Sequence, residues 1–81
     1  MLSEIVWDWE PQMNFTIEME QEADGRWIAE VMELPGAVVY GQTRDEATAK
    51  VQALALRVLA ERLEHGEGAP RDLMTVSFKA A

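Results

Sequence analysis

The stretch DGRWIAEVMELPGAVVYGQTRDEA, residues 24–47, decides most of the fold. It opens on an Asp-Gly pair, which is typical of a hairpin turn, and it is broken again by the Leu-Pro-Gly corner at 34–36. A Thr-x-x-Glu sequence at 43–46 is a capping box, which predicts the start of a helix. The apolar runs between these breaks predict strands over 26–32 and 37–42.

The flanking segments complete a single sheet. Residues 13–21 alternate apolar and polar side chains, which predicts a strand with one buried face. The helix is expected over 44–65, ending before Gly66, and a last strand is expected over 73–79 with Met74, Val76 and Phe78 facing inward. The fold class is therefore α+β, a βββαβ chain whose antiparallel meander carries one helix on one face. A right-handed crossover places the last strand parallel to the first, in strand order 3-2-1-4.

The pairing of the first two strands follows from their faces. Placing Ile17 opposite Val31 and Met19 opposite Ala29 puts nearly all the apolar side chains on one side of the sheet. A shift of one residue would bury glutamates, so we predict the first register. It sets Glu18 directly opposite Glu30 on the other face.

Three motifs in this stretch resemble the HicB family of antitoxins from bacterial toxin–antitoxin pairs. They are Gly25-x-Trp27-x-Ala29, Leu34-Pro35-Gly36 and Gly41-x-Thr43-x-x-Glu46-Ala47. The resemblance covers roughly residues 13 to 79 and implies a reduced ribonuclease-H-like fold. We therefore divide the chain into an N-terminal arm, 1–12, and one HicB-like domain, 13–81. Many HicB proteins continue into a DNA-binding domain, which this sequence does not include, so operator binding is not carried over.

Composition narrows the classes of function. The 81 residues fit one domain, and 15 acidic residues against 7 basic ones give a net charge of −8. Autonomous nucleic-acid binding needs clustered Lys and Arg, so none is expected. No apolar run approaches the ~20 residues of a membrane span and no signal peptide is recognisable, which favours a cytoplasmic protein with no membrane partner.

The sequence has few features that are typical of a catalytic site. The chain has no cysteine, neither of its serines has a nucleophile context, and no glycine-rich phosphate loop is present. Glu18, Glu30 and Asp45 are conceivable ligands of a divalent cation in a nuclease, but no sequence feature brings Asp45 toward the other two. We expect no enzyme activity, no cofactor and no metal site.

Two surfaces are candidates for contacts with other proteins. The glutamates of the outer sheet face either point into water or form a docking patch for Arg and Lys, with apolar contact from the same face. The predicted partner-binding residues are Glu18, Glu20, Ile28, Glu30, Met32 and Glu33. By resemblance, the partner is a small basic HicA-type toxin that cleaves mRNA.

The second surface concerns self-association. Trp7 and Trp9 in the arm either cap the core or fill a groove on a second subunit, and the leucines of the helix form a stripe wider than one small sheet requires. We predict at least a homodimer, with an interface made of Trp7, Trp9, Leu56, Leu59 and Leu63. A self-associating scaffold without a toxin, or a metal-dependent nuclease, are the alternative functions.

Overall fold

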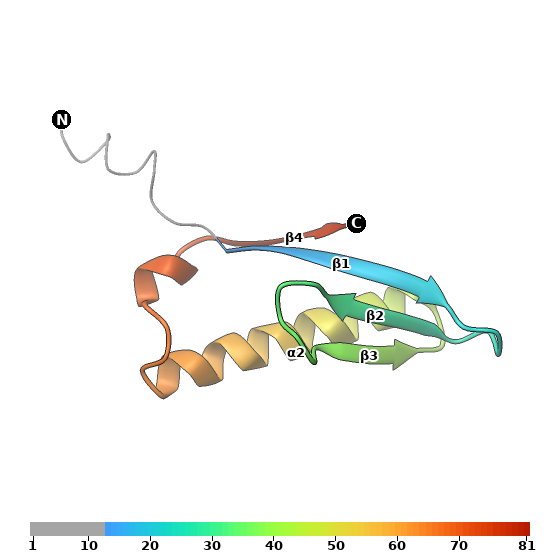
Figure 1. Cartoon of the computed structure of the whole chain (residues 1–81), viewed down its shortest axis with the longest axis horizontal. Helices are drawn as coiled ribbons and strands as arrows, with labels where there is room; N and C mark the ends of the chain where they lie inside the picture. Colours follow the sequence, from blue (N-terminus) through green and yellow to red (C-terminus); the bar gives the residue numbers. More distant parts are fainter. Residues whose placement is uncertain (1–12) are drawn as a thin grey trace.

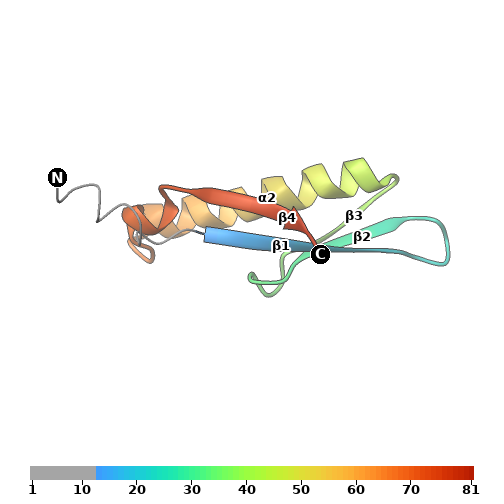
Figure 2. The ribbon, with the colours of Figure 1, turned by 90° about the horizontal axis from the view of Figure 1, so that it is seen from above.

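The computed structural model describes residues 13–81 and shows one four-stranded sheet covered on one face by one long helix (Figures 1 and 2). The strands are β1 (Met13–Gln21), β2 (Trp27–Val31), β3 (Val38–Gly41) and β4 (Val76–Ala80), and the helices are α2 (Arg44–Glu64) and the short 3-10 helix η1 (Pro70–Leu73). The strand order is β3-β2-β1-β4, with β4 parallel to β1 and the other neighbours antiparallel. The predicted βββαβ arrangement is confirmed. The arm, with Trp7 and Trp9, lies outside the described residues.

The register of the first two strands is also as predicted. Ile17 pairs with Val31, and Glu18 pairs with Glu30 on the opposite face. The Met32 N–H donates to the Thr16 carbonyl at 2.9 Å, which extends the ladder past the end of β2. The reason is the pleat of the sheet, because only this register buries the apolar set of both strands together.

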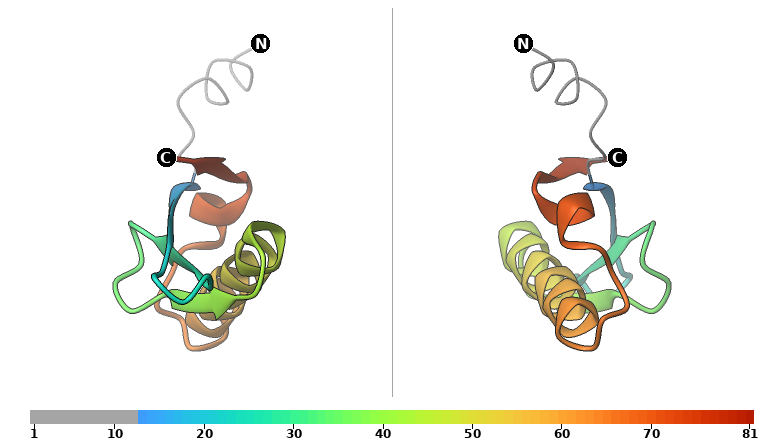
Figure 3. Two further views of the ribbon diagram at one scale, coloured as in Figure 1. Left: turned by 90° about the vertical axis from the view of Figure 1, so that its right-hand side faces the viewer. Right: turned by 90° about the vertical axis from the view of Figure 1, so that its left-hand side faces the viewer.

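The core lies between the inner face of the sheet and α2, which packs mainly on β2 and β3 (Figure 3). On β1 and β4, Phe15 stacks on Phe78 with ring centroids 5.5 Å apart. The Leu-Pro-Gly corner contributes to the core as well as turning the chain, since Leu34 and Ala37 are both buried. The buried side chains are Phe15, Ile17, Ala29, Val31, Leu34, Ala37, Ala47, Val51, Ala55 and Leu59.

The start of α2 is fixed by two local contacts. The Thr43 hydroxyl accepts from the Glu46 N–H at 3.0 Å, as the capping box predicts, while the Glu46 carboxylate accepts from the Gln42 N–H, one residue earlier than the box requires. Gly41 lets the helix approach β3 closely. A Cβ atom at that position would lie 2.6 Å from the Ala47 backbone nitrogen, so only glycine fits there without a shift.

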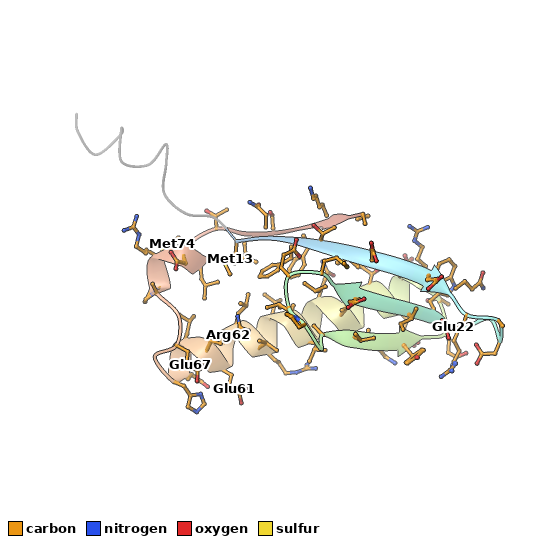
Figure 4. All side chains as sticks on the ribbon, in the orientation of Figure 1. Met13, Glu22, Glu61, Arg62, Glu67 and Met74 are labelled. Carbon is orange, nitrogen blue, oxygen red and sulfur yellow. The ribbon has the colours of Figure 1, made fainter. Side chains whose placement is uncertain are left out.

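The last strand differs from the sequence prediction. β4 begins at Val76, because Pro70 starts a 3-10 turn in which the Met74 N–H donates to the Arg71 carbonyl. Met74 therefore lies in the turn before the strand (Figure 4) and is 69% exposed, so its predicted inward orientation is wrong. Val76 and Phe78 do pack against the core as predicted.

Candidate functional site

The outer face of the sheet, turned away from α2, collects most of the residues that the sequence singled out for partner binding. Strand pairing arranges them in two rows across three strands. One row runs Val38, Glu30, Glu18, and the next runs Tyr40, Ile28, Glu20. The acidic side chains thus lie on β1 and β2, and the apolar ones lie on β2 and β3.

Within residues 13–81, no basic side chain forms an ion pair with the paired carboxylates of Glu18 and Glu30. Glu18 and Glu30 are Cα partners, and like charges in such positions repel. The ion pairs within residues 13–81 join Arg26 to Asp24 and Lys50 to Glu46, so neither involves this pair. A cation brought by a partner would therefore find carboxylates with no basic neighbour in ion-pair distance among residues 13–81.

Glu33 behaves differently from the other glutamates. Its Oε1 accepts from the Thr16 N–H at 2.7 Å, and its Oε2 accepts from the Thr16 hydroxyl at 2.9 Å. The hydrogen bond from the backbone N–H is the main reason why the pKa of Glu33 is lowered below its ordinary value, with smaller help from the hydroxyl and from the charge of Lys79. This carboxylate ties the turn after β2 to β1, so it supports the outer face and is less available to a partner.

The apolar part of the outer face is larger than the sequence prediction. Ile28 and Met32 were predicted, and the structure adds Val38 and Tyr40, which are 39% and 44% exposed. Tyr40 is also covered on one side by the Arg26 guanidinium, 4.6 Å from its ring centroid. Val38 and Tyr40 are two residues apart, so they lie on one face of β3. Matching the faces of β3 and β2, as was done for β1 and β2, would have added Val38 and Tyr40 to the predicted site.

A shallow hollow of about 440 Å³ opens beside these glutamates, where β1 continues past the end of β4. Three of the four carboxylates of the site line it, together with the first residue of α2. Its lining residues are Ile17, Glu18, Met19, Glu20, Ile28, Glu30, Arg44, Ala80 and Ala81. The hollow is wide enough for a side chain of a partner, and its charged lining consists of three glutamates and one arginine.

The residues predicted for self-association separate into two groups. Leu56 and Leu63 lie on the outer side of α2 and are 49% and 39% exposed. Leu59 is only 5% exposed and packs in the core, so its assignment to an exposed interface is corrected. Its position on the helix, one turn from the buried Ala55, turns it inward. Trp7 and Trp9 lie outside the described residues.

The described residues contain no cluster that could hold a metal ion. Between residues 13 and 81, no three side chains of His, Asp or Glu lie close enough together to hold a metal ion, so Glu18, Glu30 and Asp45 do not form the conceivable cluster. None of the helices in that part of the chain is long and apolar enough to cross a membrane. The outer face of the sheet presents fixed negative charge beside exposed apolar side chains.

The chain is 34% identical over 61 residues to the UPF0150 protein Ta0767 of Thermoplasma acidophilum, an alignment that covers 74% of this chain and 87% of the relative. No family model and no solved structure matches the chain.

Proposed function

The chain belongs to the UPF0150 family, and we propose that it acts as a cytoplasmic, non-catalytic antitoxin module that binds a small basic toxin on the outer face of its sheet. UPF0150 is a HicB-like family, which agrees with the resemblance of the three motifs. The proposed partner is a HicA-type toxin that cleaves mRNA. Such a protein binds a polyanion and so carries the Lys and Arg that this face would attract.

The observation that carries the proposal is the pairing of Glu18 with Glu30 on an exposed face. The fold itself gains nothing from two adjacent carboxylates, because like charges in opposed positions on a sheet are destabilising. A partner that supplies Arg or Lys converts this repulsion into attraction when it binds. The exposed side chains beside the glutamates, Met32, Val38 and Tyr40, provide the apolar contact that holds a complex after encounter.

The glutamates and the apolar side chains should therefore have different effects on the kinetics of binding. Charges at the edge of an interface mainly accelerate association, whereas apolar contacts at its centre slow dissociation. Reversing both charges in Glu18→Lys with Glu30→Lys should slow association with the basic toxin about tenfold or more at low salt. Met32→Ala should leave association within about twofold and mainly accelerate dissociation.

The test is association kinetics with a small basic HicA-type protein, measured by stopped-flow or surface plasmon resonance. A matched control is Glu61→Lys with Glu67→Lys, which changes the net charge equally in the last turn of α2 and in the loop that follows it, beyond β2 and β3 (Figure 4). The control should bind at nearly the wild-type rate. Equal association rates for the two double variants would show that this face is only a solvated surface.

A further inference from the structure

Helix α2 carries a second apolar stripe that the core does not use. The core stripe repeats every four residues at Ala47, Val51, Ala55 and Leu59. The second stripe consists of Ala49, Ala53, Leu56, Ala60 and Leu63. Its spacings are four, three, four and three residues, which is the heptad spacing of helices that pack against other helices. At 100° per residue, the centre of this stripe lies about 140° from the centre of the first, and the two stripes come closest at Leu63, one turn after Leu59.

Most of the second stripe is exposed. Leu56 and Leu63 are among the exposed large hydrophobic side chains, Ala49 and Ala60 are exposed, and Ala53 is half-buried. The stripe spans 14 residue steps, or about 21 Å at the rise of an α-helix. Three alanines in this row leave room for a second helix to approach closely.

The distribution of charge indicates which partner fits this surface. Residues 13–42, the three antiparallel strands and their turns, carry six acidic residues and one basic residue. α2 carries equal numbers, four basic (Arg44, Lys50, Arg57, Arg62) and four acidic (Asp45, Glu46, Glu61, Glu64). Two copies of a chain with net charge −8 repel each other, and that repulsion is smallest where they meet through α2, whose charges sum to zero.

We propose that two copies of this chain pair through the outer stripe of α2, to form a two-fold symmetric dimer that leaves the outer face of the sheet open. A second copy is the occupant favoured by the stripe because it supplies the same heptad spacing and the same balanced charge. A strongly basic partner would find no excess of carboxylates on α2, and it would be drawn to the sheet instead. One helix pair buries less than the ~800 Å² per partner of a standard interface, so the dimer forms at micromolar or higher concentration.

The symmetry of such a dimer places Leu56 at its centre. Leu56 is the middle residue of the stripe, with two members on either side, so it meets its own copy across the two-fold axis whichever way the helices run. Met32 offers a matched control, because it is 46% exposed against 49% for Leu56, and it lies on the sheet instead.

The first experiment is sedimentation equilibrium of the full 81-residue chain between roughly 10 and 500 µM, the range expected for a small interface. Wild type should shift from the 9.1 kDa monomer to twice that mass with rising concentration. Leu56→Glu should weaken the dimer at least tenfold, and Met32→Glu, with the same added charge, should change it less than twofold. A monomer throughout, or equal effects of both variants, overturns the proposal. Thermal melts of both variants would show that each is folded.

The second experiment uses the absence of cysteine from the chain. Single variants Leu56→Cys and Met32→Cys are oxidised with glutathione disulfide at the same protein concentration. A disulfide needs Cα atoms about 4.4–6.8 Å apart, which the alanines beside Leu56 permit in a close helix pair. Leu56→Cys should form the covalent dimer at least tenfold faster than Met32→Cys. Equal rates for the two variants contradict the pairing of α2.

Discussion

The outer face of the sheet and the outer side of α2 lie on opposite sides of one small core, and they differ in charge and in pattern. The sheet presents glutamates in pairs beside exposed apolar side chains, within a segment that has six acidic residues and one basic residue. The helix presents an apolar stripe within a balanced set of charges. A strongly acidic protein of this size thus has one face suited to an oppositely charged partner and another suited to a copy of itself.

The difference between the two surfaces shows that the distribution of net charge over the protein matters as well as its size. A charge of −8 spread evenly would oppose self-association everywhere on the surface. Here residues 13–42 hold most of the excess, so the helix stays close to neutral. A chain of this length buries little apolar surface by itself, and association through a neutral face is one way to bury more.

We expect the largest effect on stability at Gly41, where the sheet contacts the first turn of α2. Gly41→Ala would place Cβ against the Ala47 backbone, which cannot move as a side chain can. We expect a loss of about 1–3 kcal/mol in the free energy of unfolding, as for other overpacked sites. Thermal or urea unfolding measures it. Gly68→Ala is the control, since its Cβ would have no atom within 4 Å; equal losses in both variants would contradict the close approach.

The sequence predicted the strand order, the register and the start of α2 because each depends on local signals or on the alternation of one strand. The pairing of Glu18 with Glu30 followed from burying Ile17 with Val31. The site was predicted less completely. Val38 and Tyr40 join it only because β3 pairs with β2, which is a contact between strands and not a property of either.

Two other positions were predicted wrongly. Leu59 was grouped with Leu56 and Leu63 because all three are leucines near one stripe, although its burial against the sheet separates it from them. Met74 has the alternation of a strand residue, yet the turn that begins at Pro70 delays β4 until Val76. Leu59 continues the four-residue spacing of Ala47, Val51 and Ala55, so the helix period could have placed it inward, whereas the alternation around Met74 gives no such signal.

Salt concentration should affect binding at the two surfaces differently. Screening weakens attraction between opposite charges, so raising NaCl from about 50 to about 500 mM should slow association of the basic partner about tenfold or more. Pairing of α2 joins two chains of the same sign through a balanced face, so its equilibrium should be unchanged or strengthened. Stopped-flow kinetics and sedimentation, in the same buffers, measure the two responses. A dimer that weakens with salt as steeply as the complex would show that both surfaces depend on attraction between charges.

The smallest effect concerns Glu33, the one glutamate of the outer face whose side chain accepts hydrogen bonds within residues 13–81. Its pKa is lowered below its ordinary value of 4.5, chiefly by the Thr16 N–H and to a lesser extent by the Thr16 hydroxyl. A carboxyl whose pKa is depressed by folding adds stability above its unfolded pKa, and this contribution is lost as the pH falls through the folded pKa. Glu33 should thus stay ionised to lower pH than a free glutamate.

Thr16→Val removes the hydroxyl but keeps the backbone N–H, so the pKa of Glu33 should rise while remaining below 4.5. NMR titration of the side-chain carboxyl carbon measures this shift. Asp24 is the internal control, because its lowered pKa depends on hydrogen bonds from Arg26, first from the backbone N–H and then from the side chain, and none comes from Thr16. A Glu33 pKa that does not change in the variant would show that the backbone N–H alone holds this carboxylate. The turn after β2 would then keep its place on the outer face without help from the hydroxyl.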